Sequence, residues 1–111
     1  MAAVSAIHLM WAEPQEVRIS CYLPTGNTTY DGTVPYEGII AANKEHLGDM
    51  ALLFDAEMNL IGMYEVRDIG GNSLLKSGRA VDVFRDDIDR AYDFIKEYGD
   101  HGYVVWIKAE G

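Results

Sequence analysis

Two aspartates, Asp68 and Asp82, are the residues of this sequence whose type and spacing could do acid–base chemistry. Both lie in EVRDIGGNSLLKSGRAVDVF, residues 65–84, where two β-prone runs each carry one aspartate. Asp82 stands between two valines, although aspartate is depleted in strands. If the loop at 69–77 folds the second run back beside the first, the carboxylates converge, and a like charge with partial burial raises the pKa of one of them. A carboxyl group that stays protonated near neutral pH is suited to general acid catalysis.

Plainer interpretations of both aspartates stay open at the level of sequence. Asp82 shares a strand face with Ala80 and Phe84, and this face is either solvated or part of a partly apolar cleft. Asp68 precedes glycines, which is common turn chemistry. The run that starts at Asp68 superficially resembles the Asp-Thr-Gly signature of aspartic proteases. That family places its motif in the first third of the subunit, whereas only 43 residues follow Asp68, so the sequence disfavours a protease.

Length and composition indicate one folded domain. The chain has 111 residues, of which 49% are hydrophobic and 24% charged, as in ordinary globular proteins. Its net charge is −9, and no run of lysines or arginines marks a phosphate-binding face. Nucleic acid is therefore not expected as a partner.

Cysteine and histidine usage argues against a metal centre. Cys21 is the only cysteine, which excludes an internal disulfide, and its place in the apolar run EVRISCYL indicates a small core residue. The three histidines, His8, His46 and His101, lie far apart with no HxxxH spacing. We expect neither a metal nor an organic cofactor.

The first residues, MAAVSAIHLMWA, form an apolar segment with two interpretations. They lack the basic flank of a signal peptide and are shorter than the ~20 residues that span a bilayer. One interpretation is the trimmed tail of an export signal or membrane anchor; the other is a packed N-terminal arm or short helix. We therefore separate an arm at 1–14 from a single domain at 15–111.

Hydrophobic periodicity predicts a chain of short strands with one helix. Alternation or short apolar runs predict strands at 16–23, 38–42, 50–55, 59–67, 78–84 and 102–109. Residues 24–36 are rich in Gly, Pro, Thr and Asn and predict a long loop, while the two strands around 56–59 predict a hairpin.

A helix is predicted over about 86–98. Its apolar residues recur at helical spacing, with Asp86 as the N-terminal cap and Gly99 as the stop; they are Ile88, Ala91, Tyr92, Ile95 and Tyr98. Six short strands without long helical crossovers favour a small, mainly β barrel, because closure removes exposed edges.

The order of short motifs along the chain is similar to that of a known family. The motifs are Cys21-Tyr22, Thr29 to Gly32, Gly38 to Ala42, Asp68 to Gly71, Lys76 with Gly78 and Arg79, Asp82-Val83-Phe84, the helix at 86–98, and Val104 to Ile107. In this order they resemble the three-aspartate domain of Gram-positive cell-wall proteins of the stationary-phase-survival type. More distantly, they resemble the catalytic barrel of membrane-bound lytic transglycosylase A. The likeness covers about four fifths of the chain, and Asn43 stands where the family usually has its first aspartate.

The resemblance implies a fold, an activity and a set of site residues. The fold would be a six-stranded double-psi β-barrel. The activity would be that of a lytic transglycosylase, which cleaves the bond between N-acetylmuramic acid and N-acetylglucosamine in peptidoglycan glycan strands and forms a 1,6-anhydro sugar, in the cell wall or outside the cell. By analogy Asp82 is the catalytic acid/base, and Asp68 is the neighbour that tunes it and positions the substrate. The implied substrate-binding residues are Thr29, Gly70, Gly71, Asn43 and Lys76, with Tyr22 and Tyr30 as candidates for stacking on sugar rings. Because Asn43 can hydrogen-bond but cannot ionise, a non-catalytic glycan-binding or assembly module of the same fold, or a barrel in a phage particle, is the alternative.

Overall fold

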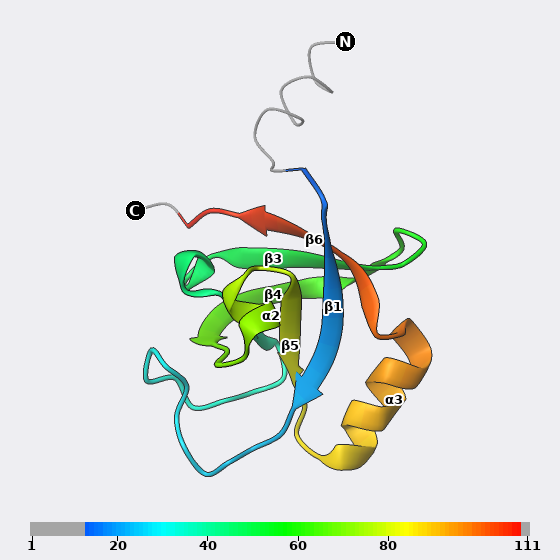
Figure 1. The fold of residues 1–111 in the computed structure, drawn as a ribbon. Helices are drawn as coiled ribbons and strands as arrows, with labels where there is room; N and C mark the ends of the chain where they lie inside the picture. Colours follow the sequence, from blue (N-terminus) through cyan, green and yellow to red (C-terminus); the bar gives the residue numbers. More distant parts are fainter. Residues whose placement is uncertain (1–12, 110–111) are drawn as a thin grey trace.

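The six strands form one closed barrel, which is the architecture that the sequence predicts (Figure 1). The structure is a computed structural model and describes residues 13–109. Around the barrel the strand order is β1-β5-β2-β4-β3-β6. The strands are β1 (Gln15–Tyr22), β2 (Ile39–Ala42), β3 (Met50–Asp55), β4 (Leu60–Ile69), β5 (Ala80–Phe84) and β6 (His101–Ile107).

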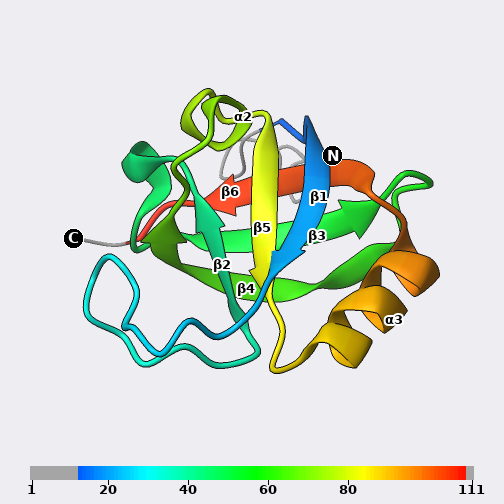
Figure 2. The same cartoon turned by 60° about the horizontal axis from the view of Figure 1, so that its bottom comes forward.

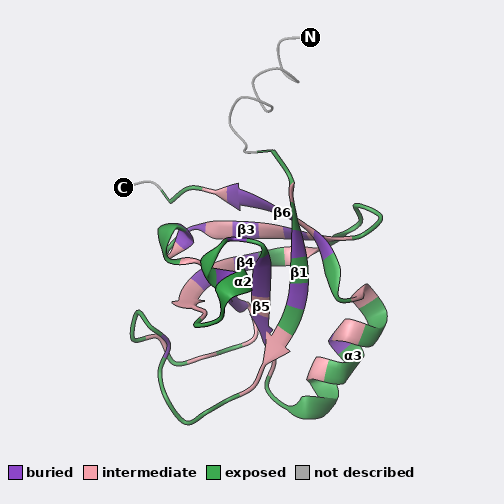
Figure 3. Ribbon diagram, in the orientation of Figure 1, coloured by how far each residue is buried: buried purple, intermediate pink, exposed green. Residues whose placement is uncertain are grey.

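Alternating side chains divide each strand between the barrel interior and its outer surface. In β1, Val17 and Ile19 are buried, whereas their neighbours Arg18 and Ser20 are exposed. Branched aliphatic residues from all six strands meet inside and are fully buried; among them are Val17, Ile40, Leu53, Val66, Val81, Val83 and Val104. Figure 3 shows these buried stretches on the barrel strands, with most of the exposed surface on loops and helices. The core is therefore the barrel interior, and its outer wall is available for a functional site.

The barrel contains both parallel and antiparallel strand pairs. β1 runs parallel to β5 and β2 runs parallel to β4, while the other four pairs are antiparallel. The predicted hairpin is the β3–β4 pair, whose turn contains Met58 with a positive φ of 66°. One detail of the sequence prediction is wrong: β5 does not lie beside β4, because β2 is inserted between them.

Two further helical segments and one main helix complete the fold. A 3-10 turn, η1 (Lys44–His46), follows β2, and a short helix, α2 (Ser73–Lys76), lies within the predicted loop between β4 and β5. The main helix is α3 (Ile88–Tyr98), with Gly99 as its C-cap. Asp87, not Asp86, is the N-cap, since its side chain accepts a hydrogen bond of 2.9 Å from the Arg90 N–H.

The face that α3 packs on the barrel differs in part from the predicted one. Phe94 is the buried residue of the helix, and Ile95 and Tyr98 pack beside it against the core. Ile88 and Tyr92 are instead 54% and 70% exposed. The apolar stripe of the sequence is wider than the contact area, because the helix touches the barrel mainly through β1.

The predictions for the N-terminal segment at 1–12 lie outside the described residues. Within residues 13–109, no helix has the length and apolar character needed to cross a membrane.

Candidate active site

A β-bulge places Asp68 on the outer wall of the barrel. Between β2 and β4 the register runs from Ile40 opposite Val66 to Ala41 opposite Asp68, so Arg67 is the extra residue. Val66 points into the core, and simple alternation would also turn Asp68 inward. The bulge reverses this and aims the carboxylate at the surface, which is a common use of bulges at functional sites.

Asp82 reaches the same part of the wall from the other side of β2. Ala41 pairs with Asp68 on β4 and with Asp82 on β5. Directly paired residues project from the same face, so the two carboxylates flank the methyl group of Ala41. Figure 2 shows β1, β5 and β2 side by side in the foreground, with α2 at one end of these strands and the long loop after β1 at the other. The strand between the aspartates carries a small residue, Ala41, which is itself buried.

Burial makes Asp82 the candidate acid of this pair. Its side chain is half-buried, and burial raises its pKa, as does the neighbouring Asp68 carboxylate. A hydrogen bond of 3.0 Å from the Ser20 hydroxyl to Asp82 Oδ1 works in the opposite direction by favouring the ionised form. The first two effects exceed the third, so Asp82 binds its proton more tightly than an ordinary aspartate.

Asp68 has a different environment. Its Oδ1 accepts hydrogen bonds of 3.0 Å from the backbone N–H groups of Tyr30 and Ile69. The first of these bonds connects the long loop at 23–38 to Asp68, which together with Asp82 forms the acid pair. Two neighbouring carboxylates in unlike settings are what division of labour in acid–base chemistry requires.

Tyr22 adds an aromatic ring and a phenol to the pair. Its ring packs edge-on against Phe84 at a centroid distance of 5.3 Å. Burial raises the pKa of Tyr22 above its ordinary range, and the carboxylates of Asp68 and Asp82 raise it further. The buried hydroxyl makes no hydrogen bond of acceptable geometry with the described residues, although the Asp68 carboxylate is close. An unsatisfied buried hydroxyl beside two acids is a group that a ligand could engage.

Thr29 and Tyr30 both lie in the long loop, but Thr29 is buried whereas Tyr30 is exposed. Thr29 is buried; its hydroxyl donates to Asp31 at 2.7 Å and accepts from the Thr33 N–H at 3.1 Å, so it organises the loop. Tyr30 is 53% exposed, and its ring lies under the Lys44 ammonium at 5.7 Å. Tyr30 is therefore the exposed residue of the two, and its backbone N–H contacts Asp68.

Most of the predicted substrate-binding residues that follow β2 and β4 either allow close packing of neighbouring elements or lie on the surface. A Cβ at Gly70 would lie 2.1 Å from Leu75 Cδ1, so Gly70 allows α2 to approach, whereas nothing lies within 4 Å of the corresponding point at Gly71. Asn43 donates to Glu45 at 3.1 Å, and its buried side-chain oxygen has no partner among the described residues. Lys76 is an exposed residue at the end of α2.

Ser20 belongs to the site although no sequence pattern indicated it. It is the register partner of Asp82 in the parallel β1/β5 pair. The alternation of β1 already places Ser20 on the outer face with Arg18 and Tyr22. Only the pairing of β1 with β5, which sequence periodicity does not reveal, brings its hydroxyl to the carboxylate.

The described residues form pockets in at least three places. None of these three pockets is lined by Asp68 or Asp82. One of them, about 300 Å³ in volume, lies between the end of β5 and the long loop; it is lined by Pro24, Thr25, Gly26, Asn27, Thr28, Val34, Pro35, Phe84 and Asp86. Phe84 connects it to the acid pair, because this residue follows Asp82 by two positions on the same strand face and also touches Tyr22.

Metal and thiol chemistry find no support in residues 13–109. No group of three or more His, Cys, Asp or Glu side chains in this range is arranged to hold a metal ion. Burial raises the pKa of the Cys21 thiol to about 11, so the reactive thiolate is scarce at neutral pH.

Comparison with family models, curated proteins and solved structures finds no match for this chain. The acid pair on the outer wall is therefore the observation on which a functional proposal has to rest.

Proposed function

We propose that this chain is a peptidoglycan lytic transglycosylase of the three-aspartate type, with Asp82 as the general acid/base. The observation that carries the proposal is the half-buried Asp82, whose pKa is raised by burial and by Asp68 across Ala41. A carboxyl group of this kind can hold a proton at a pH where an ordinary aspartate is ionised. The cell wall, outside the cytoplasmic membrane, is the corresponding place of action.

The reaction uses Asp82 twice. Protonated Asp82 donates its proton to the glycosidic oxygen that links N-acetylmuramic acid to N-acetylglucosamine, and the bond from this oxygen to C1 breaks. The ionised carboxylate then removes the proton from the muramic acid 6-hydroxyl as that oxygen bonds to C1. The products are a 1,6-anhydromuramic end and a free 4-hydroxyl on N-acetylglucosamine; Asp82 regains its proton, and no water is consumed.

The surroundings of the acid pair suit a sugar ligand. The pocket at the end of β5 combines an apolar wall, which includes Phe84 and Val34, with the polar side chains of Thr25, Asn27 and Thr28. Sugar rings present an apolar face and a rim of hydroxyls, so this combination matches them. The Tyr22 ring touches Phe84 of this pocket, and its buried hydroxyl, which is close to the Asp68 carboxylate, can bind a hydroxyl or acetamido group of the glycan.

The test is digestion of purified peptidoglycan sacculi, with soluble muropeptides identified by mass spectrometry. The wild-type chain should release anhydro-muropeptides, and Asp82→Asn should lower the rate by about 10² to 10⁴-fold, as loss of a general acid does. Asp93→Asn is the matched control, because Asp93 is an exposed aspartate of α3. Equal activity of the wild type and Asp82→Asn would contradict the proposal.

Asn43 supports a second candidate, a non-catalytic glycan-binding module. Its side chain cannot ionise, and its amide is held by Glu45. Co-sedimentation with sacculi without release of muropeptides would favour this module over the enzyme. In that case Asp82→Asn should leave binding nearly intact, whereas Tyr22→Phe and Tyr30→Ala should weaken it.

A further inference from the structure

The outer face of β6, β3 and the first half of β4 is almost entirely apolar. Its outward residues form three cross-strand rows, which are Tyr103, Phe54 and Leu60; Val105, Leu52 and Met63; and Ile107, Met50 and the one charged residue, Glu65. We propose that this apolar face binds the apolar segment at residues 1–12 of the same chain. The proposal is independent of the transglycosylase reaction, because neither Asp68 nor Asp82 belongs to the face.

Strand alternation and pairing show that these side chains point outward. The core residues Val104 and Trp106 flank Val105 in β6, so Val105 points away from the barrel interior. Directly paired residues project from the same face, and Leu52 pairs with both Val105 and Met63. The same pairing places the rows on either side of this one on the outer surface.

The two helices pack on other strands and leave this face to another occupant. The main contacts of α3 are with β1, and those of α2 are with β5 and β2. Figure 2 shows β6, β3 and β4 passing behind β1 and β5. Leu60 and Met63 are 60% and 58% exposed, Val105 is buried, and the other apolar residues of the face are partly exposed. A contiguous apolar surface of this kind marks an interaction site.

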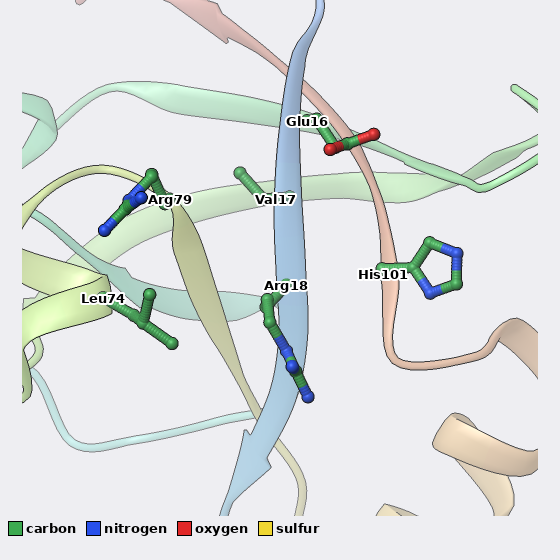
Figure 4. A pocket seen from close by; sticks show the side chains of 6 residues that line it. All are labelled: Glu16, Val17, Arg18, Leu74, Arg79 and His101. Atoms are coloured by element: carbon green, nitrogen blue, oxygen red, sulfur yellow. The ribbon is translucent and has the colours of Figure 1, made fainter.

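Charged residues mark the edge of the apolar face at β1. Glu16 pairs with Tyr103, and Arg18 pairs with His101. Figure 4 shows the side chains of Glu16, Arg18 and His101 around β1, where they line a separate pocket of about 350 Å³. The apolar surface therefore ends where β6 meets β1, and it is three strands wide.

The segment at 1–12 joins the barrel beside the apolar face. β1 begins at Gln15, whose partner in the antiparallel β1/β6 pair is Val104. The chain that precedes Gln15 therefore leads toward the part of β6 that carries Val105 and Ile107. Only two residues separate the segment from Gln15, so it starts within ~11 Å of this residue.

The segment has the composition and the length to cover the face. Ten of its twelve residues are apolar, and none is Asp, Glu, Lys or Arg. Three strands are ~10 Å across, and three rows of alternate residues extend over ~13 Å. Twelve residues span ~18 Å as a helix and up to ~40 Å when extended, so either form can cover the three rows.

Attachment and charge favour the segment over a separate partner. A group on a short tether is present at an effective concentration of the order of millimolar, whereas a second copy is present only at the concentration of the protein. The net charge of −9 makes two copies repel each other and opposes binding to an anionic lipid surface. The segment brings no acidic or basic side chain to the face.

The test is NMR of the full chain labelled with ¹³C in its methionine methyl groups, which are assigned by single Met→Leu substitutions. Met50 and Met63 report on the face. We expect nuclear Overhauser contacts from their methyl groups to the Trp11 ring or to other side chains of the segment. These contacts should persist after tenfold dilution, because the binding is intramolecular.

Met63→Lys should lower the ratio of bound to unbound segment about tenfold or more, because an ammonium without a partner would be buried under the segment. Acrylamide quenching of tryptophan fluorescence measures this change, since the other tryptophan, Trp106, is buried in the core. Leu9→Glu should increase quenching from the segment side. Tyr92→Lys is the matched control, because it makes the same replacement at an exposed position on α3, and it should leave quenching unchanged.

The alternative occupants give different results. Isotope-filtered contacts between labelled and unlabelled chains would assign the face to a second copy. A segment that gives no contact with Met50 or Met63 but binds vesicles of phosphatidylglycerol and phosphatidylethanolamine would be a membrane anchor. Either result would overturn the proposal, and so would equal quenching in Met63→Lys and Tyr92→Lys. An unchanged far-UV circular dichroism spectrum shows that each variant is folded.

Discussion

At the scale of single residues, Asp82 is subject to two opposing influences that can be removed one at a time. The Ser20 hydroxyl stabilises its ionised form, whereas the Asp68 carboxylate destabilises it. Ser20 does not need to touch the substrate to act, so it is a positioning residue for Asp82. Substitution of either neighbour should change the protonation of Asp82 without removing the carboxyl group itself.

Ser20→Ala should raise the pKa of Asp82 further, and Asp68→Asn should lower it. The first change removes a hydrogen bond to the carboxylate; the second removes a like charge. The measurement is a ¹³C NMR titration of the aspartate carboxyl carbons in each variant. In the proposed enzyme the alkaline limb of the pH–rate profile should move in the same two directions. Shifts of the same sign in both variants would contradict this description of the site.

Asp82→Asn should stabilise the protein at neutral pH while it removes activity. A carboxyl group with a raised folded-state pKa makes folding less favourable as pH rises from its unfolded pKa through its folded pKa. The amide has no such loss, so the melting temperature of the variant should exceed that of the wild type at pH 7. At pH 3, where the unfolded chain is also largely protonated at this position, the gain should disappear. A variant less stable than the wild type at pH 7 would argue that Asp82 is an ordinary structural carboxylate.

At the scale of elements, Glu37 fastens α3 to the segment that enters β2. Its carboxylate accepts two hydrogen bonds of 2.6 Å from Arg90 and one of 2.9 Å from the Asp86 N–H. The hydrogen bonds from Arg90 lower the pKa of Glu37 to about 2. The contact lies next to the pocket at the end of β5, so it also fixes one wall of the proposed sugar site.

Glu37→Gln should destabilise the fold by about 1 kcal/mol at pH 7. The pKa shift alone would give more, but Arg90 is half exposed and solvent screens the pair. Because the folded pKa is depressed, this stability is present above about pH 4.5 and is lost as pH falls toward 2. Urea denaturation at pH 7 and at pH 2 measures both values, with the exposed Glu57→Gln as control. A difference that persists undiminished at pH 2 would show that packing, not charge, is responsible.

The adjacent residues Gly70 and Gly71 differ in their surroundings: Gly70 packs against Leu75 of α2, whereas Gly71 has no neighbour on its side-chain side. Gly70→Ala should destabilise the fold by about 1–3 kcal/mol, because a methyl group would overlap the Leu75 side chain and displace α2. Gly71→Ala should have little effect, since no atom lies within 4 Å of the new Cβ position. Thermal denaturation of the two variants tests the contrast. Equal stability of the two would indicate that α2 can move away freely.

At the scale of the whole molecule, local patterns and long-range pairing contributed differently to what could be predicted. Alternation in β1 and the helical spacing after Phe84 depend on neighbours in sequence, so the strands, the main helix and a small closed barrel followed from them. The insertion of β2 between β4 and β5, and the bulge at Arg67, depend on which distant strands pair. No periodic pattern encodes that choice.

The same division applies to the candidate site. Asp82 was conspicuous because a carboxylate inside a valine-rich strand conflicts with β-propensity. Ser20 was not, because a serine on an exposed strand face is ordinary and acquires its role only from the β1/β5 register. Thr29 shows the converse: motif order suggested a binding residue, whereas its hydroxyl is occupied within the loop.

The most direct test of the central claim is digestion of sacculi in H₂¹⁸O, followed by mass spectrometry of the muropeptides. Transfer of the muramic acid 6-hydroxyl to C1 consumes no water, so the wild-type products should be anhydro-muropeptides without ¹⁸O, and Asp82→Asn should yield almost none. Muramic acid ends that carry ¹⁸O would identify a hydrolase in which Asp68 and Asp82 act on a water molecule. The absence of any soluble product from the wild type would contradict an enzymatic role for the acid pair.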